Sequence, residues 1–129
     1  MAESKRWHLQ GAPDHAYSGE EARSLLGNRL AWASQETWFE DDDGRLLAVV
    51  TNGTRAMVML LNGEGDPGEH LSDPRAEGES SGYLLANGQI DSYADRDTVD
   101  FGAAGRAVAH LIDHGAWPDG ATVDDDRGM

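Results

Sequence analysis

The sequence contains no cysteine, which excludes disulfides, thiolate catalysis and metal centres built on cysteine. Basic residues are also scarce: 10 Lys and Arg stand against 24 Asp and Glu, for a formal net charge of −14 at pH 7. This balance excludes a protein that binds nucleic acid through a basic surface, because phosphate contacts need clustered Lys and Arg. Long hydrophobic runs are absent as well, since the longest apolar stretches, 46–50 and 56–61, are far too short to span a bilayer.

The two ends of the chain carry little apolar character. The first residues, MAESKRWH, lack the apolar core of a signal peptide, so we expect a cytoplasmic location. After Trp117 the chain continues with Pro118, Gly120 and the acidic run Asp124–Asp126. A length of 129 residues fits one domain. The sequence therefore predicts a single α+β domain over residues 1–117 and a disordered acidic tail over residues 118–129.

Glycine-containing dipeptides divide the middle of the chain into hairpins. Asn52–Gly53 and Asn87–Gly88 each separate two apolar runs, and Asp43–Gly44 closes an acidic run. Such dipeptides suit the positive backbone angles of tight hairpin turns. Apolar residues at both parities over 56–61 indicate a strand that is covered on both faces. The predicted strands are residues 30–39, 45–51, 54–61, 82–86 and 89–94, with a further short strand near 6–9. Strand positions assign these large side chains to the core: Trp32, Trp38, Met57, Met59, Tyr83 and Tyr93.

Two helices are predicted on either side of the hairpins. Ser18 and Glu21 have the spacing of a capping box ahead of a helix that we expect to end at Gly27. A second helix is expected over residues 98–114, with Asp97 as its N-cap and Gly115 just beyond its end. Its apolar residues recur at helical spacing: Phe101, Ala104, Val108, Leu111 and Ile112. The predicted fold class is α+β, an antiparallel meander sheet of about five to six strands with two helices packed against it.

Residues 62–81 form the longest stretch for which no element is predicted. The stretch contains four glycines, two prolines and, apart from His70, one basic residue, Arg75. A loop of this length in a small domain is usually functional or disordered. We therefore treat most of its carboxylates as candidate binding residues: Glu64, Asp66, Glu69, Asp73 and Glu77.

No arrangement of residues predicts catalysis. His110 and His114 have the spacing of a helical metal pair, but a helical projection points both toward solvent. The run Asp41–Asp43 lacks the alternating acids of a calcium loop and is typical of a solvated hairpin turn. Glu69 and His70 are a possible acid–base pair, but no nucleophile lies near them in the sequence. The sequence therefore predicts a protein that is not an enzyme and that holds no cofactor and no metal.

The acidic excess has two interpretations. It can act only to keep the protein soluble. Alternatively, it directs the protein onto a basic surface, where acidic groups speed encounter and match the potential of the partner.

A series of short motifs runs from residue 44 to residue 99: GRLL at 44–47, TNG at 51–53, RAMVML at 55–60, GDPGE at 65–69, DP at 73–74, GY at 82–83, NGQ at 87–89 followed by Asp91 and Tyr93, and DTV at 97–99. In order and spacing these motifs resemble the first immunity family of bacterial polymorphic toxin systems, and the resemblance covers residues 30–115. It implies a small α+β protein, encoded beside a toxin, that binds the toxin as a cytosolic antidote. Toxins associated with this family typically carry nucleic-acid deaminase domains.

The resemblance and the charge together predict an immunity protein that occludes the substrate groove of its toxin, since such a groove must attract a phosphate backbone. We expect a one-to-one complex with the toxin domain and no direct contact with nucleic acid or membrane. The contacts are assigned to acids of the long loop and of one hairpin turn: Glu64, Asp66, Glu69, Asp73, Glu77, Asp41, Asp42 and Asp43. Two alternatives stay open. One is a small acidic adaptor or regulator that binds another basic protein, and the other is a metal-binding enzyme that uses His70, His110 and His114.

Overall fold

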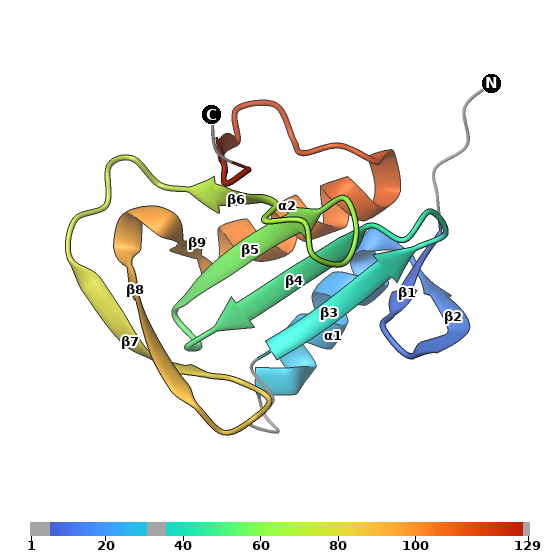
Figure 1. Cartoon of the computed structure of the whole chain (residues 1–129), viewed down its shortest axis with the longest axis horizontal. Coiled ribbons are helices and arrows are strands. Elements are labelled where there is room, and N and C mark those ends of the chain that lie inside the picture. Colours follow the sequence, from blue (N-terminus) through green and yellow to red (C-terminus); the bar gives the residue numbers. More distant parts are fainter. Residues whose placement is uncertain (1–5, 31–35, 128–129) are drawn as a thin grey trace.

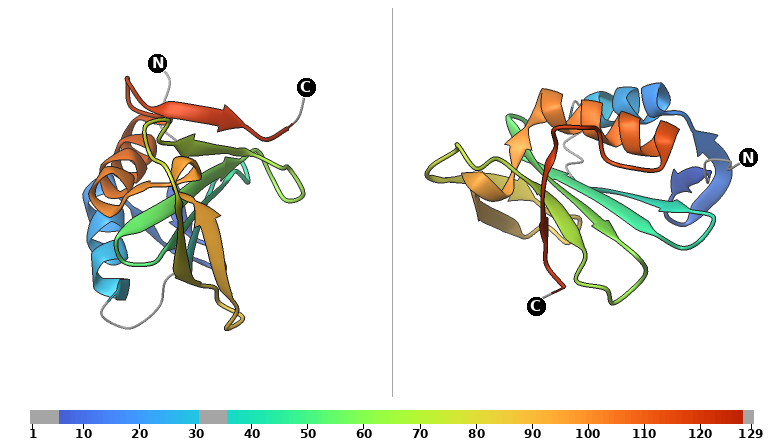
Figure 2. Two further views of the ribbon diagram at one scale, coloured as in Figure 1. Left: turned by 90° about the vertical axis from the view of Figure 1, so that its left-hand side faces the viewer. Right: turned by 90° about the horizontal axis from the view of Figure 1, so that it is seen from above.

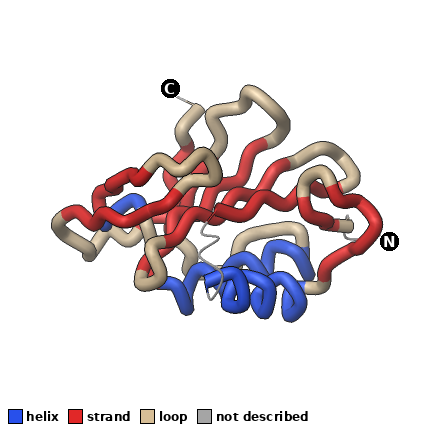
Figure 3. The backbone as a smooth tube through the Cα atoms, turned by 90° about the horizontal axis from the view of Figure 1, so that it is seen from below, coloured by secondary structure: helices blue, strands red, loops and turns tan. Residues whose placement is uncertain are grey.

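The computed structural model describes residues 6–30 and 36–127 of the chain. In this part, two helices lie side by side and cover one face of an antiparallel sheet (Figures 1 and 3). The helices are α1 (Gly19–Leu30) and α2 (Phe101–His114). The predicted α+β fold class is therefore confirmed.

The sheet has more strands than the sequence predicts. In the described residues it has eight, in the order β10-β6-β5-β4-β3-β1-β2, with the short β9 paired to β5 off this path. Their bounds are β1 (Trp7–Leu9), β2 (Ala12–Tyr17), β3 (Glu36–Asp41), β4 (Leu46–Thr51), β5 (Arg55–Leu61), β6 (Glu69–Ser72), β9 (Val99–Asp100) and β10 (Thr122–Asp125). The sequence patterns miss β2, β6, β9 and β10 because these strands are short or polar, and β2 contains a proline, as edge strands often do.

β7 (Glu79–Leu84) and β8 (Ile90–Ala94) form a separate two-stranded sheet instead of continuing the meander. This hairpin lies on the side of the main sheet away from the helices (Figure 2). Hydrogen bonds from Asn52 Nδ2 to Ser81 O (3.1 Å) and from Ala86 N to Glu36 Oε1 (2.9 Å) join it to the main sheet. With helices on one side and the hairpin on the other, β4 is buried along all six of its residues.

The main core lies between the helices and the sheet, where Leu47, Val58 and Val108 are fully buried. The strand predicted to be covered on both faces is β5, but there the burial alternates: Val58 is buried, whereas Met57 and Met59 are only half-buried. The other large side chains that were predicted to lie in the core differ in how deeply they are buried. Tyr83 is fully buried, Trp38 and Tyr93 are half-buried, and Trp32 lies outside the described residues.

The helix ends test the predicted caps. Ser18 and Glu21 do form the capping box, with Glu21 N donating to Ser18 Oγ (3.1 Å) and Ser18 N to Glu21 Oε1 (2.9 Å). The predicted end of this helix at Gly27 is wrong, since α1 continues to Leu30. Of the strand predicted over residues 30–39, residues 36–39 belong to β3, and residues 31–35 lie outside the described residues. Neither described helix has both the length and the apolar character needed to cross a bilayer.

The second helix begins later than predicted. It starts at Phe101, because Val99 and Asp100 pair with β5 as β9, and the predicted N-cap Asp97 belongs to the short helix η1 (Asp95–Asp97). Its predicted end is confirmed, since Gly115 adopts φ 77° and its N–H bonds to the carbonyl of Leu111.

The predictions of a disordered tail and of a long open loop are both wrong in the described residues. Residues 122–125 form β10, which pairs antiparallel with β6 from Thr122↔Ser72 to Asp125↔Glu69. The half-buried Trp117 and Val123 pack against the core and hold this return segment in place. Because β10 belongs to the main sheet, the domain extends past residue 117. Residues 62–81 likewise contain β6 and the start of β7, so they are not one loop.

Candidate functional site

The pairing of β6 with β10 gathers acidic residues from distant parts of the sequence at one edge of the sheet. We call this surface the acidic edge and define it by six carboxylates around one imidazole and one guanidinium: Asp66, Glu69, Asp97, Asp124, Asp125 and Asp126 around His70 and Arg127. In Figure 1 the C-terminal end of the chain lies beside β6, where these segments meet. The acidic edge divides into two clusters, one centred on each cation.

Arg127 is the centre of the first cluster. Its Nη2 lies 2.9 Å from Asp66 Oδ2, and its Nη1 lies 3.0 Å from Glu69 Oε1 and 3.3 Å from Asp125 Oδ1. The hydrogen bond from Arg127, with a second from the backbone N–H of Asn62, lowers the pKa of Asp66. The same carboxylates, Asp66 first and then Glu69, raise the pKa of Arg127. The cluster therefore joins three carboxylates to one guanidinium.

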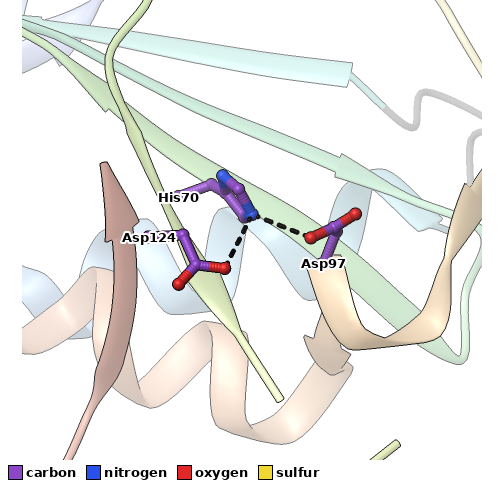
Figure 4. Close-up of side chains that lie close together, drawn as sticks. All are labelled: His70, Asp97 and Asp124. Carbon is purple, nitrogen blue, oxygen red and sulfur yellow. Dashed lines mark hydrogen bonds and ion pairs between the residues drawn. The ribbon is translucent and has the colours of Figure 1, made fainter. Parts of the chain in front are cut away.

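His70 is the centre of the second cluster (Figure 4). Its Nδ1 lies 2.7 Å from Asp126 Oδ2, and its Nε2 lies 3.1 Å from Asp97 Oδ1 and 3.7 Å from Asp124 Oδ2. The pKa of His70 is raised: burial opposes the charge, but hydrogen bonds to Asp126 and Asp97 outweigh it. Both ring nitrogens of His70 thus face carboxylates.

Backbone contacts fix the segments that carry these side chains. His70 on β6 and Asp124 on β10 are direct cross-strand partners, so their side chains lie on the same face. Asp126 N donates to Gly68 O (2.8 Å), which holds the residue after β10 against the start of β6. Gly68 has φ 82°, and a side chain there would also press on the carbonyl of Leu60, so this turn requires glycine. Asp97 is positioned through η1, whose Arg96 carbonyl accepts a hydrogen bond from Asp73 N (2.7 Å).

The predicted binding acids do not share one environment. Asp66 and Glu69 belong to the acidic edge, and Glu64 is exposed in the same turn as Asp66. Asp73 instead bonds to Arg55 (3.1 Å), beside Thr98, in a structural network under the hairpin. Glu77 is exposed but is not among the residues of either cluster.

The three acids of the β3–β4 turn also separate. Asp41 is 3% exposed, and its carboxylate accepts hydrogen bonds from the backbone N–H groups of Asp43 and Arg45 and from Arg45 Nε (2.8 Å). The Asp41 carboxylate is therefore buried and bonded within the turn, which contradicts its assignment as a binding residue. Asp42 and Asp43 are exposed on the turn itself, where Asp42 Oδ2 accepts from Arg6 N (3.3 Å).

His110 and His114 do not contribute to the acidic edge. Their ring centroids are 4.5 Å apart, and His110 Nδ1 lies 2.9 Å from the carbonyl oxygen of Ala116. Within residues 6–30 and 36–127, the grouping of three potential metal ligands contains His70 but neither of these histidines. His110 instead lines an open groove of about 940 Å³ between α2 and the segment that leads into β10.

The sequence analysis missed five residues of the acidic edge: Asp97, Asp124, Asp125, Asp126 and Arg127. The sequence predicts Asp97 as a helix N-cap, and it predicts the other residues to lie in a disordered tail. The signal that was available is the apolar Val123 between polar neighbours, which is weak evidence for a strand on its own. Nothing in the local sequence says that this strand would pair with residues 69–72.

Comparison with protein-family models, curated proteins and solved structures finds no match to this chain. The resemblance to the first immunity family therefore stays a hypothesis. The observations that bear on function are the net charge of −14 and the geometry of the acidic edge.

Proposed function

We propose that this chain is a cytoplasmic immunity protein that binds and inhibits a toxin domain, with the acidic edge seated against the basic groove in which the toxin holds its nucleic-acid substrate. The observation that carries the proposal is the convergence of six carboxylates from three segments onto one sheet edge, with His70 and Arg127 as the cations among them. The motif resemblance and the net charge of −14 support the same conclusion.

The arrangement suits recognition better than solubility alone. Charges that serve only solubility are best spread over a surface, and they need no fixed geometry. On the acidic edge, Arg127 and the backbone N–H of Asn62 hold Asp66 and Glu69 in place, so the entropy cost of ordering these two carboxylates on binding is small. Carboxylates grouped at a sheet edge present negative charge, which is what a nucleic-acid groove attracts.

In this proposal the chain does no chemistry and acts by steric and electrostatic occlusion. The toxin-binding residues are Glu64, Asp66 and Glu69 from the original assignment, together with the acids of β10 and the residue after it. Asp41 is not included because its carboxylate is buried in the β3–β4 turn, and Asp73 is not included because it bonds to Arg55, outside the acidic edge.

The first test is co-expression with the toxin domain encoded by the neighbouring gene, followed by co-purification. A stable one-to-one complex and restored growth of the host are expected. Absence of both binding and rescue would overturn the proposal.

The second test locates the interface. The double variant Glu64→Gln/Asp125→Asn removes one exposed charge beside the acidic edge and one on it. The control variant Asp14→Asn/Glu20→Gln removes two exposed charges near β2, at the opposite edge of the sheet. Steering predicts that the first pair slows association by about five- to tenfold at low salt and that the second pair has little effect. Equal effects of the two pairs would assign binding to overall charge, not to the acidic edge.

A further inference from the structure

We propose that His70, Asp97 and Asp124 form a binding site for one divalent transition-metal ion, with Asp126 orienting the imidazole. The site lies within the acidic edge and uses only groups of this chain, so it can be tested without the toxin. It combines one nitrogen ligand with two oxygen ligands, and the three ligand atoms lie within 4.8 Å of one another (Figure 4).

The distances between ligand atoms match those expected across a shared ion. With metal–ligand bonds of about 2.0–2.2 Å, two ligands of a tetrahedral ion are about 3.3 Å apart. His70 Nε2 lies 3.1 Å from Asp97 Oδ1 and 3.7 Å from Asp124 Oδ2, on either side of that value. The two carboxylate oxygens, at most 4.8 Å apart, need to approach by no more than about 1.5 Å. Both are half-exposed side chains that can turn by this amount without moving the backbone.

Asp126 supplies the outer partner that a metal-binding histidine normally has. Its Oδ2 lies 2.7 Å from His70 Nδ1, so Nδ1 keeps its proton and donates to the carboxylate. A histidine held in this way presents Nε2 as the ligand, with its ring orientation fixed and its basicity increased. A metal ion bound at Nε2 takes the place of the direct contact between Nε2 and Asp97 Oδ1.

The composition of the cluster distinguishes it from an ordinary ion pair. One imidazolium is neutralised by one carboxylate, yet three surround His70, while the nearby Arg127 is engaged by Asp66, Glu69 and Asp125. Three carboxylates around one imidazole leave an excess of acidic groups at the cluster, and a bound dication offsets their mutual repulsion.

The ligand set selects the class of ion. An imidazole nitrogen with carboxylate oxygens suits zinc, manganese, iron or cobalt, whereas magnesium prefers oxygen ligands alone. The His70 side chain is 13% exposed, but Asp97 and Asp124 are 45% and 47% exposed. The metal would therefore have protein on one side and water on the other, as in sites that keep open coordination positions.

The experiment is calorimetric titration of Zn²⁺ into the full-length protein without a histidine tag, after treatment with a chelator. Binding is expected to saturate at one ion per chain. Asp97→Asn and Asp124→Asn should each weaken affinity at least tenfold, and Asp126→Asn by about 10- to 100-fold, as for other outer partners of a metal-bound histidine. Magnesium should not compete.

Two matched control variants distinguish a specific metal site from a general attraction of Zn²⁺ to acidic groups. Asp125→Asn makes the same change one residue from Asp124, at a carboxylate that faces Arg127, and His114→Gln removes an exposed histidine elsewhere. Both should bind Zn²⁺ within about twofold of the original protein. A loss for Asp125→Asn as large as for Asp124→Asn, or the absence of saturation at one ion, would overturn the proposal.

A measurement on the unaltered protein covers the case in which a variant fails to fold. Mn²⁺ added in substoichiometric amounts should broaden the NMR signals of the His70 ring and of the amides of residues 97 and 124 before any others. Broadening centred on another part of the chain, or spread evenly over the acidic residues, would contradict the site.

Discussion

A single methyl group at Gly19 should destabilise the fold, because α1 and α2 touch there through their backbones. Gly19 is buried at the start of α1, and its N–H donates to Asp113 Oδ1 on α2 (2.8 Å). A Cβ at this position would overlap the backbone carbonyl of Ala109 and the carboxylate of Asp113. A carbonyl within a helix cannot move without shifting the helix, so the two helices would have to separate.

The size of the effect follows from three contributions. Overpacking against a rigid neighbour costs about 1–3 kcal/mol. Weakening a hydrogen bond to a charged group costs up to about 1.5–3 kcal/mol. Replacing glycine by alanine in a helix stabilises the helix by about 0.5–1 kcal/mol, which offsets part of this loss. Gly19→Ala should therefore lower the free energy of unfolding by about 2–5 kcal/mol, which is roughly 6–20 °C in Tm for a domain of this size.

Gly27 provides the matched control on the same helix. It is exposed, and a Cβ built there meets nothing within 4 Å, so Gly27→Ala should stabilise the protein by about 0.5–1 kcal/mol. Thermal and urea unfolding followed by circular dichroism at 222 nm would compare the two variants. If Gly19→Ala unfolds at or above the Tm of Gly27→Ala, the close approach of the helices is wrong.

Two further predictions concern buried or partly buried polar groups. Asp41→Ala should destabilise the protein by about 2 kcal/mol, because Arg45 and two backbone N–H groups lose their acceptor. The control Asp42→Asn should change the free energy of unfolding by less than about 0.5 kcal/mol. Urea unfolding measures both, and equal effects would refute the buried role of Asp41. Burial, and then the hydrogen bond and charge of Asp91, raise the pKa of Tyr93 to about 12. Since a raised pKa favours the neutral phenol in the folded state, this contribution to stability is complete below about pH 10 and is lost as the pH rises toward 12. Tyr93→Phe should reduce the late-ionising part of the phenolate absorbance, to which Tyr83 also contributes because burial raises its pKa, and should flatten the loss of stability over that range; an unchanged titration curve would contradict the assignment.

Local patterns predicted the parts of this fold that depend on neighbouring residues. The turns at Asn52–Gly53 and Asn87–Gly88 join paired strands, and the capping box at Ser18 begins α1. The apolar stripe of α2 is buried against the sheet, and Gly115 ends the helix in a left-handed conformation. Each of these features is decided by backbone geometry or side-chain spacing over a few residues, so one sequence is enough to find it.

The same patterns failed where a short polar segment joins a distant partner. EHLS at 69–72 and TVDD at 122–125 have no strand signal that exceeds that of a loop, yet each supplies the hydrogen-bonding edge that the other lacks. The prediction of a disordered tail came from counting the charges of Asp124–Asp126 without a partner for them. Arg127 and His70 are those partners, and each contacts an acid far away in the sequence: Asp66 lies 61 residues from Arg127, and Asp126 lies 56 residues from His70.

The sequence by itself determined the fold class, the hairpins, the two helices and the acidic character of the surface, because composition and short-range periodicity carry that information. Only the tertiary structure decided which acids act together. It buried Asp41 in a turn, bonded Asp73 to Arg55, and brought Asp97, Asp124 and Asp126 to His70. The physical reason is that a site made from separate segments depends on strand pairing over long sequence separations, and that pairing is set by the whole sheet and not by any segment within it.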